Sequence, residues 1–225
     1  GILFASFIYM ALPAGLIFLE PDWGSAMVCI GLWIGFLLLS GLRVKHLVAG
    51  FLLLSLVGAL SWQFFLAPYQ KERIVGFFKP EYDPLGVNYS VIQSKIAIGS
   101  AGMLGKGLRQ GTQAQLGFLT EPATDFIFAA FVEEWGIVGG FVLVGAFVLL
   151  LVRIIRIGWH AGNNFGRFVC IGAVLMFLIE FFLNVGSNLG LIPVVGVTFP
   201  LLSYGGSSLL TKLMLLGVIQ SISLR

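Results

Sequence analysis

Charged residues are scarce in this chain of 225 residues, and this scarcity is its most informative feature. Asp, Glu, Lys and Arg make up 10% of the sequence, whereas 58% of the residues are hydrophobic. Soluble domains carry about 25% charged residues, so the composition excludes an ordinary soluble domain. The mean hydropathy is +1.01. Apolar blocks without charge, such as Ser25–Leu42 and Trp135–Val152, are long enough to cross a bilayer at about 1.5 Å per residue. We therefore predict an all-α integral membrane protein.

Cysteine is also scarce. The two cysteines, Cys29 and Cys170, lie in apolar segments and have neither metal-type spacing nor the pattern of a disulfide framework. No His, Cys or Asp cluster has the spacing of a metal site, so no protein-held metal is predicted. The net charge of +3 is spread thinly along the chain, which excludes nucleic acid as a partner.

Six apolar spans are predicted, which makes the protein a polytopic transmembrane helix bundle. They are Gly1–Leu19, Trp23–Leu42, Leu47–Ala67, Phe126–Val152, Phe168–Gly190 and Leu201–Leu224. The chain begins with Gly1 inside an apolar run, without an initiator Met or a signal peptide. We interpret residues 1–225 as a single membrane domain that is a fragment of a larger one, with upstream helices missing.

The positive charges divide the connections between spans into two classes. Basic residues occupy alternate connections and the end of the chain: Arg43, Lys45, Arg153, Arg156, Arg167 and Arg225. The other connections contain Glu20 and Asp22, or only neutral residues as in Leu191–Phe199. The positive-inside rule places the basic connections in the cytoplasm and the others outside.

One outward connection is unusually long. Residues 68–125 are too many for a structureless loop and indicate a large, functional extracytoplasmic loop. The apolar stretch Val91–Ile98 within it is expected to form a short helix at the membrane interface, in contact with membrane lipid.

Glycines at fixed spacing raise two further interpretations. Gly31–Gly35 and Gly136–Gly140 fit the small-xxx-small spacing of closely packed transmembrane helices, and packing is the expected role. Gly102–Gly107 superficially resembles a phosphate-binding loop. It lacks the required glycine at position 100 and the Ser or Thr at position 107, so an ATPase is excluded.

A buried ion pair is predicted from the spans alone. Glu180 and Lys212 lie at similar distances from Arg167 and Arg225, at what we take to be the cytoplasmic ends of two antiparallel helices. Both charges then lie near the middle of the bilayer, where an isolated charge costs at least about 2.5–3.5 kcal/mol. We expect the two to pair. The rival interpretation is that each lines the same water-filled cavity separately.

Ordered motifs run through the whole chain and resemble those of a known family. They are Glu20-Pro-Asp-Trp-Gly-Ser25, Tyr89-Ser-Val-Ile-Gln93-Ser-Lys95, Gly105-Lys106-Gly107, Gly111-Thr-Gln113, Glu121-Pro-Ala-Thr124-Asp125-Phe-Ile-Phe128, Glu133-Glu-Trp-Gly136, Asn184-Val-Gly186, Gly190-Leu-Ile-Pro193 and Pro200-Leu-Leu-Ser-Tyr-Gly-Gly-Ser-Ser208. The chain is similar to the SEDS family (shape, elongation, division and sporulation). The triplet at Gly111 is more like the elongation branch than the division or sporulation branches. Departures such as Thr120 for the usual proline leave the Thr124–Asp125 pair intact.

The resemblance implies a fold of ten transmembrane helices, of which this chain is the C-terminal part. It implies a peptidoglycan glycosyltransferase that polymerises lipid II into glycan strands at the outer face of the bacterial cytoplasmic (inner) membrane, releasing polyprenyl pyrophosphate. It further implies a partner, a class B penicillin-binding protein that acts as transpeptidase. Two other interpretations remain open: a lipid II flippase or other polyprenyl-lipid transporter, and a scaffold that only binds a cell-wall enzyme.

The chemistry of such a transfer needs few groups. A carboxylate accepts the proton of the attacking hydroxyl, and cations stabilise the departing pyrophosphate. A divalent cation, Mg²⁺ or Mn²⁺, on the pyrophosphate is chemically reasonable, and the sequence leaves it open. The candidate substrate-binding residues are Arg73, Lys95, Lys106 and Arg109 as anion partners, together with Gln93, Glu121 and Thr124. Each cation could instead be a solvated charge or a lipid-headgroup contact.

Asp125 is the candidate catalytic carboxylate, because it lies just before a membrane span on the outer side and matches the essential aspartate motif of the family. The alternative is that Thr124 or Asp125 only caps the helix. The positive end of that helix is expected to lower the proton affinity of Asp125. Glu121 is the second candidate base. Glu133 and Glu134 are expected to lie about 12 Å deeper and to be structural.

Overall fold

The computed structural model describes residues 2–20, 22–41, 68–79, 83–86 and 88–224, with single or paired positions between 45 and 63. In this part of the chain the regular structure is helical: α1 (Ile2–Leu19), α2 (Trp23–Leu39), α4 (Pro68–Phe78), α5 (Tyr89–Ser100), α6 (Thr112–Gln115), α7 (Ile127–His160), α8 (Asn164–Asn188) and α9 (Gly206–Ser223). The expected span Leu47–Ala67 lies largely outside the described residues.

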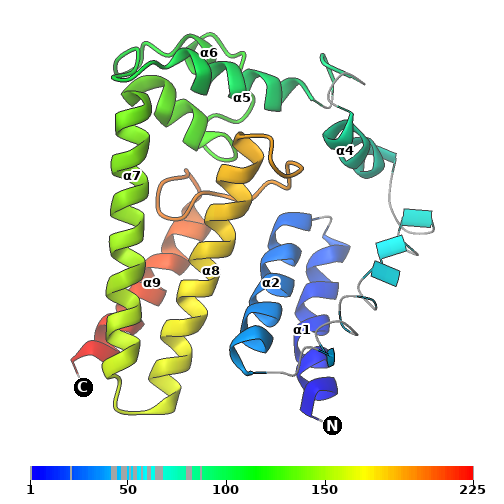
Figure 1. Ribbon diagram of the computed structural model, residues 1–225, viewed down its shortest axis with the longest axis vertical. Coiled ribbons are helices and arrows are strands. Elements are labelled where there is room, and N and C mark those ends of the chain that lie inside the picture. The colour runs from blue at the N-terminus through cyan, green and yellow to red at the C-terminus, as the bar shows by residue number, and fades with distance from the viewer. Residues whose placement is uncertain are drawn as a thin grey trace.

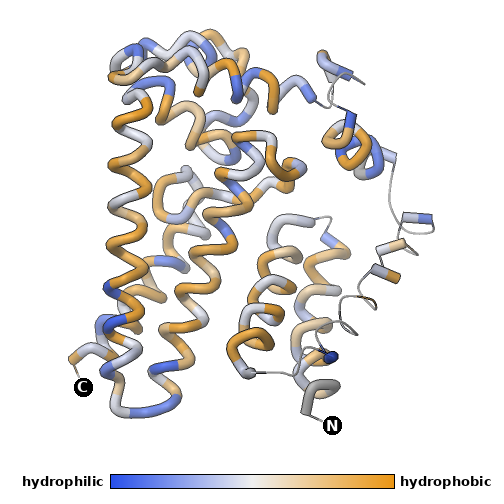
Figure 2. Tube along the Cα trace, in the orientation of Figure 1, coloured by the Kyte–Doolittle hydropathy of each residue, from blue (hydrophilic) through white to orange (hydrophobic). Residues whose placement is uncertain are grey.

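The chain is a polytopic helical membrane protein, as its composition predicts. Helices α7, α8 and α9 are long and apolar enough to cross a membrane, and α1 and α2 contain shorter apolar segments. Figure 2 shows hydrophobic residues along the shafts of α7 and α8 and hydrophilic residues where the two helices are joined. Large apolar side chains such as Phe141 and Leu149 of α7 are more than two-thirds exposed, as expected for a surface covered by lipid.

The helices pack in a row that starts at the N-terminus. Helix α1 packs on α2, α2 on α8, and α8 on α7, while α9 contacts both α7 and α8 (Figure 1). A Cβ atom on Gly31 or Gly35 would lie 3.0 Å or 2.9 Å from side-chain atoms of Ile179 or Leu175 of α8. The expected role of these two glycines in close helix packing is confirmed.

Helix α7 is not the single straight span that the sequence predicts. Gly136 has φ 75° and ψ −179°, which divides α7 into a short limb, Ile127–Trp135, and a long limb that continues to His160. This region of φ/ψ space is essentially restricted to glycine. Gly136 is the point at which the chain changes direction. It does allow a close approach, since a Cβ there would collide with backbone atoms of Met103, Leu104 and Gly105, but the partner is this loop and not a second transmembrane helix as expected.

The segment Gly102–Gly107 closes this break in the helix. Its amides at Lys106 and Gly107 donate to the last carbonyls of the short limb, at Glu133 and Glu134. Its carbonyls at Gly102 and Met103 accept from the first amides of the long limb, at Ile137 and Val138. Backbone groups that both limbs would otherwise leave unpaired are satisfied by one loop.

Residues 191–205 form a re-entrant loop rather than the outward connection expected for Leu191–Phe199. The loop turns back into the bundle, and Phe199 is buried among Phe128, Phe147 and Phe181 with ring centroids 5.6–6.3 Å apart. Irregular backbone at this depth is tolerated where protein rather than lipid surrounds it. Helix α9 consequently begins inside the bundle (Figure 1).

Helices α5 and α6 lie at the end of the bundle opposite to the α7–α8 turn (Figure 1). The stretch Val91–Ile98 is part of α5, so the helix expected there is present. The basic α7–α8 turn thus lies far from α5 and α6, and the expected sidedness of residues 68–125 stays a prediction.

Candidate active site

A cavity of about 380 Å³ brings together acidic residues from distant parts of the sequence. Glu20 and Asp22 come from the α1–α2 turn, and Asp125 precedes α7. Arg73 of α4 lines the same cavity, and residues 193–196 of the re-entrant loop form its wall. The catalytic candidate therefore lies in a polar cavity and not on an open surface.

The start of α7 shows that Asp125 is not a helix cap. The N-cap residue is Phe126, and no side chain of that residue caps the helix. The amide of Ala129 in the first turn instead donates to Oδ1 of Asn188, at 3.0 Å. The alternative that Thr124 or Asp125 caps α7 is therefore wrong, because α8 supplies the cap.

Hydrogen bonds to three consecutive carbonyls hold the backbone around Asp125 in place. The carbonyl of Ala123 accepts from the amide of Tyr204, and that of Thr124 accepts from Oγ of Ser203, at 2.8 and 2.6 Å. The carbonyl of Asp125 accepts from the side-chain amides of Asn184 and Asn188, at 2.9 and 2.8 Å. The aspartate is thus fixed by α8 and by the re-entrant loop.

The electrostatic setting of Asp125 differs from the sequence-based expectation. Burial raises the pKa of the Asp125 carboxyl above its usual value, and the negative charge of Glu121 raises it further. Arg73 and the hydroxyl of Thr124 lower this pKa, but by less. The expected lowering by the helix end is wrong in its net direction, because loss of hydration outweighs the favourable interactions.

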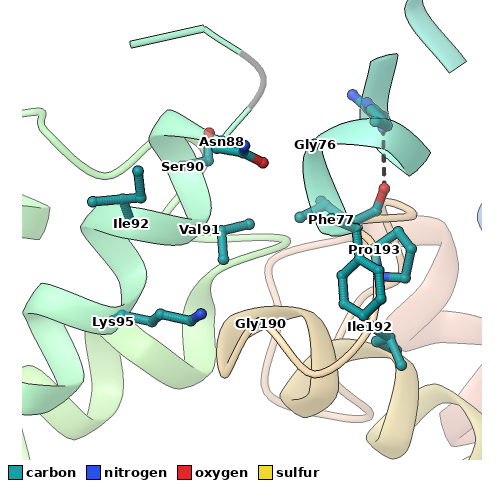
Figure 3. A pocket seen from close by; sticks show the side chains of 12 residues that line it. Gly76, Phe77, Asn88, Ser90, Val91, Ile92, Lys95, Gly190, Ile192 and Pro193 are labelled. Atoms are coloured by element: carbon teal, nitrogen blue, oxygen red, sulfur yellow. Dashed lines mark hydrogen bonds between the residues drawn. The ribbon is translucent and has the colours of Figure 1, made fainter. Parts of the chain in front are cut away.

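A second, smaller cavity adjoins the first and carries basic residues. Its volume is about 110 Å³, and it shares Arg73 and the loop residues Pro193 and Val194 with the acidic cavity. Nη1 of Arg73 donates to the carbonyl of Val194 at 3.3 Å. Figure 3 shows the ammonium group of Lys95 extending from α5 toward Gly190. A Cβ on Gly190 would collide with Cε and Nζ of Lys95, so the glycine leaves room for this side chain.

Lys106 and Arg109 are not brought to either cavity. Nζ of Lys106 contacts Glu133 Oε1 at 2.7 Å and also donates to Ser100 and Thr112. The backbone amide of Arg109 donates to Glu134 Oε1 at 3.1 Å. Neither residue lines the cavities described above, and neither does Gln93.

Glu133 is a structural residue, although its place differs from the expected one. Its side chain is fully buried and accepts from the amides of Gln113 and Ala114, at 2.9 and 3.1 Å, in addition to Lys106. Gln113 and Ala114 belong to α6, and Lys106 lies in the loop that precedes it. Glu133 is therefore at the α6 end of the short limb and not deeper in the bundle, because the break at Gly136 reverses the expected direction.

The contact expected between Glu180 and Lys212 is present. Nζ of Lys212 lies 3.0 Å from Oε2 of Glu180, and both side chains are largely buried. Lys212 also donates to Ser208 Oγ at 2.6 Å and to Thr198 Oγ1, in the re-entrant loop, at 3.3 Å. The ion pair therefore links α8, α9 and the loop that forms the cavity wall.

Sequence reasoning did not select four residues of this region as site residues: Glu20, Asp22, Asn184 and Asn188. Asn184 and Asn188 are completely buried one turn apart on an apolar helix. Polar side chains inside a membrane span are costly, and that cost was the available signal. Within the described residues, no group of three His, Cys, Asp or Glu side chains is placed to hold a metal ion.

The fold and the site define a helical membrane protein with a carboxylate in a polar cavity beside a re-entrant loop. The family model of the FtsW, RodA and SpoVE cell cycle proteins matches residues 2–225. The chain belongs to this family.

Individual relatives agree with this assignment. The chain is 40% identical over 215 residues to the peptidoglycan glycosyltransferase MrdB of Escherichia coli K12, covering 96% of the chain and 58% of the relative. It is 40% identical over 225 residues to the stage V sporulation protein E of Bacillus subtilis, covering 99% and 58%. The identity to the peptidoglycan glycosyltransferase RodA of Treponema pallidum is 39%, covering 84% and 44%. The chain thus spans only about half the length of these relatives.

Two solved structures are similar. One is a chain of a peptidoglycan synthase complex described for its coordination of polymerization and crosslinking, with a TM-score of 0.77, 35% identity, and coverage of 97% of this chain and 60% of the other. The second is a mutant of the rod shape determining protein RodA of Thermus thermophilus, with a TM-score of 0.60, 27% identity, and coverage of 97% and 56%.

Proposed function

We propose that this chain is the catalytic part of a peptidoglycan glycosyltransferase that polymerises lipid II, with Asp125 as the general base. The observation that carries the proposal is the position of Asp125. Its carboxyl lines the acidic cavity, and Asn188 of α8, rather than Asp125, caps the first turn of α7. The relatives named peptidoglycan glycosyltransferase support the reaction. A raised pKa makes the carboxylate a stronger base once it is ionised.

The two adjoining cavities fit the two sides of a displacement reaction. A sugar hydroxyl gives its proton to Asp125 as its oxygen bonds to the anomeric carbon of the donor. The bond from that carbon to the pyrophosphate breaks, and the electron pair leaves with the pyrophosphate. Arg73 and Lys95 would stabilise the charge that develops on this leaving group. A base on one side and cations on the other favour inversion at the anomeric carbon.

The remaining site residues divide into two groups. Glu121 and Thr124 lie next to Asp125 and are proposed to contact the sugar substrates, with Glu121 as the second candidate base. Lys106 is assigned to the outer loop, where it already binds Glu133.

The cellular setting is part of the proposal. Lipid II is used at the outer face of the bacterial cytoplasmic membrane, so residues 68–125 would form the extracytoplasmic loop. We place the protein in the elongation branch of its family. A class B penicillin-binding protein is the proposed partner, which is supported by the similar chain in a complex that coordinates polymerization and crosslinking.

The Asp125→Asn variant of the full-length protein tests the proposal. Asparagine keeps the size of the side chain but cannot accept the proton, so polymerisation of lipid II by the purified protein should fall by at least about 100-fold. The variant should remain folded and inserted in the membrane. Glu134→Gln, which changes a carboxylate outside both cavities, is the matched control. Near-normal polymer formation by Asp125→Asn would overturn the proposal, and lipid translocation without polymer by the unmodified protein would favour a transporter.

A further inference from the structure

Helix α8 carries two buried side-chain amides that converge on one atom of the candidate base. Asn184 and Asn188 are 1% and 0% exposed. Their Nδ2 groups donate to the main-chain oxygen of Asp125 at 2.9 and 2.8 Å. A carbonyl oxygen has two lone pairs, and two donors from one rigid helix hold its direction more closely than one would.

Each amide has a further contact that extends the arrangement. Oδ1 of Asn188 accepts from the amide of Ala129 at 3.0 Å, which holds the first turn of α7. Nδ2 of Asn184 also donates to the carbonyl of Val197 at 2.8 Å. One NH₂ group thus joins the backbone of Asp125 to the re-entrant loop, whose preceding residues, 193–196, form the opposite wall of the acidic cavity.

The amides occupy positions where apolar residues would be less costly to bury. The surrounding spans are apolar, and an unpaired amide in such an environment costs about 1–3 kcal/mol in proteins. Both amides are paired with backbone atoms: those of Asp125, which lines the cavity, and of Val197, which follows the residues of the re-entrant loop that line it. Their placement therefore determines where Asp125 stands relative to the wall that it faces.

We propose that Asn184 and Asn188 are positioning residues for Asp125: they fix its backbone carbonyl and, through Asn184, the width of the cavity in which its carboxyl acts. This inference rests on the proposed function. The two amides do not touch substrate. They act by holding the base within the small range of positions from which it can take the proton, where a displacement of about 1 Å can cost 100-fold in rate.

Asn184→Ala is the variant that tests this role, because Asn188 still satisfies the Asp125 carbonyl and the protein should fold. In the full-length protein, kcat for lipid II polymerisation should fall about tenfold, while KM changes less than about twofold. Ser187→Ala is the matched control: Ser187 is 5% exposed on the same helix, and its hydroxyl donates only to the Asn184 carbonyl, at 2.8 Å. Its kcat should stay at the wild-type value.

A second variant and a second measurement keep the test decisive. Asn184→Ser cannot reach Asp125, and its hydroxyl can donate to a carbonyl one turn earlier, so the new side chain itself stays paired if Asn184→Ala is unstable. Both variants remove the donor to the Val197 carbonyl. Carbodiimide modification of Asp125, followed by mass spectrometry, reports its exposure without any activity. It should increase in both variants and not in Ser187→Ala.

The outcomes separate the two proposals. Wild-type kcat and unchanged modification in folded Asn184 variants would overturn the positioning role, as would an equal loss of kcat in Ser187→Ala. A wild-type protein that makes no polymer would overturn the proposed function, while the modification of Asp125 would still report whether Asn184 fixes it.

Discussion

Nζ of Lys212 and Oε2 of Glu180 lie 3.0 Å apart inside the helix bundle, with 3% and 12% of their side chains exposed. The pair lies between α8 and α9, and the lysine also binds Thr198 of the re-entrant loop. An unpaired charge at this place would be far less stable than either an ion pair or two neutral side chains.

Breaking this pair should therefore cost more than removing both of its charges. Lys212→Met leaves the Glu180 carboxylate without its partner, and we expect a loss of about 3 kcal/mol in unfolding free energy. Glu180→Gln combined with Lys212→Met should recover most of this loss. Unfolding in detergent, followed by tryptophan fluorescence, measures both. Equal losses in the single and double variants would show that the unpaired Glu180 carboxylate carries no such cost and would contradict the prediction.

Gly136 should not tolerate a side chain. At φ 75° and ψ −179° alanine is strained, and its Cβ would collide with backbone atoms of Gly105, Met103 and Leu104. Gly136→Ala should lower stability by at least about 3 kcal/mol, since the backbone strain alone costs about 1–3 kcal/mol. Gly145→Ala, on the same helix with open space around the added Cβ, is the control and should be neutral or slightly stabilising. The melting temperatures of the two variants test this, and equal values for Gly136→Ala and Gly145→Ala would contradict the prediction.

The raised pKa of Asp125 predicts a pH-dependent effect on stability. A carboxyl whose folded pKa lies above its unfolded pKa stabilises the fold fully below the unfolded value, near about 3.9, and this contribution is lost as pH rises through the folded pKa. Asp125→Asn does not titrate. Its stability relative to the wild type should therefore increase from pH 4 to pH 7. Melting temperatures at both values test the sign, and an advantage that shrinks toward pH 7 would contradict the assigned burial.

The sidedness of the two ends can be tested by labelling. Leu108 is 66% exposed in the outer loop, and Gly162 lies in the α7–α8 turn with open space around an added Cβ. A membrane-impermeant maleimide applied to intact cells should label Leu108→Cys and not Gly162→Cys, whereas inverted membrane vesicles should give the opposite result. The parent protein, with Cys29 and Cys170, is the control. Labelling of Leu108→Cys only in inverted vesicles would show that the topology is the opposite of the predicted one.

The sequence predicted the helices whose apolar residues form uninterrupted blocks. Helices α1 and α2 begin and end within a few residues of the expected bounds. The break in α7 was not predicted, because the same four-residue glycine spacing occurs in the unbroken α2, and Glu133 and Glu134 before Gly136 were interpreted as structural residues of a continuous span. Only the contact with Gly105, far away in sequence, distinguishes the two cases.

The site was predicted in part for a similar reason. The contact of Glu180 with Lys212 and the place of Asp125 just before a span could be derived from the sequence, since each follows from depth or local position. The catalytic role of Asp125 rests on the resemblance of its motif to the family and stays a prediction. The capping of α7 by Asn188 and the return of residues 191–205 into the bundle depend on hydrogen bonds between distant segments. A neutral segment between two spans gives no local signal of such a return.

Different parts of the protein form hydrogen bonds with the two ends of the short limb, Ile127–Trp135. Asn188 holds its first turn, and the backbone of Lys106 and Gly107 holds its last. The limb is an unbroken helix that spans the distance between the outer loop and Asp125. One continuous stretch of hydrogen-bonded helix therefore connects Gly102–Gly107, beside the outer loop, to the backbone that follows Asp125 in the acidic cavity.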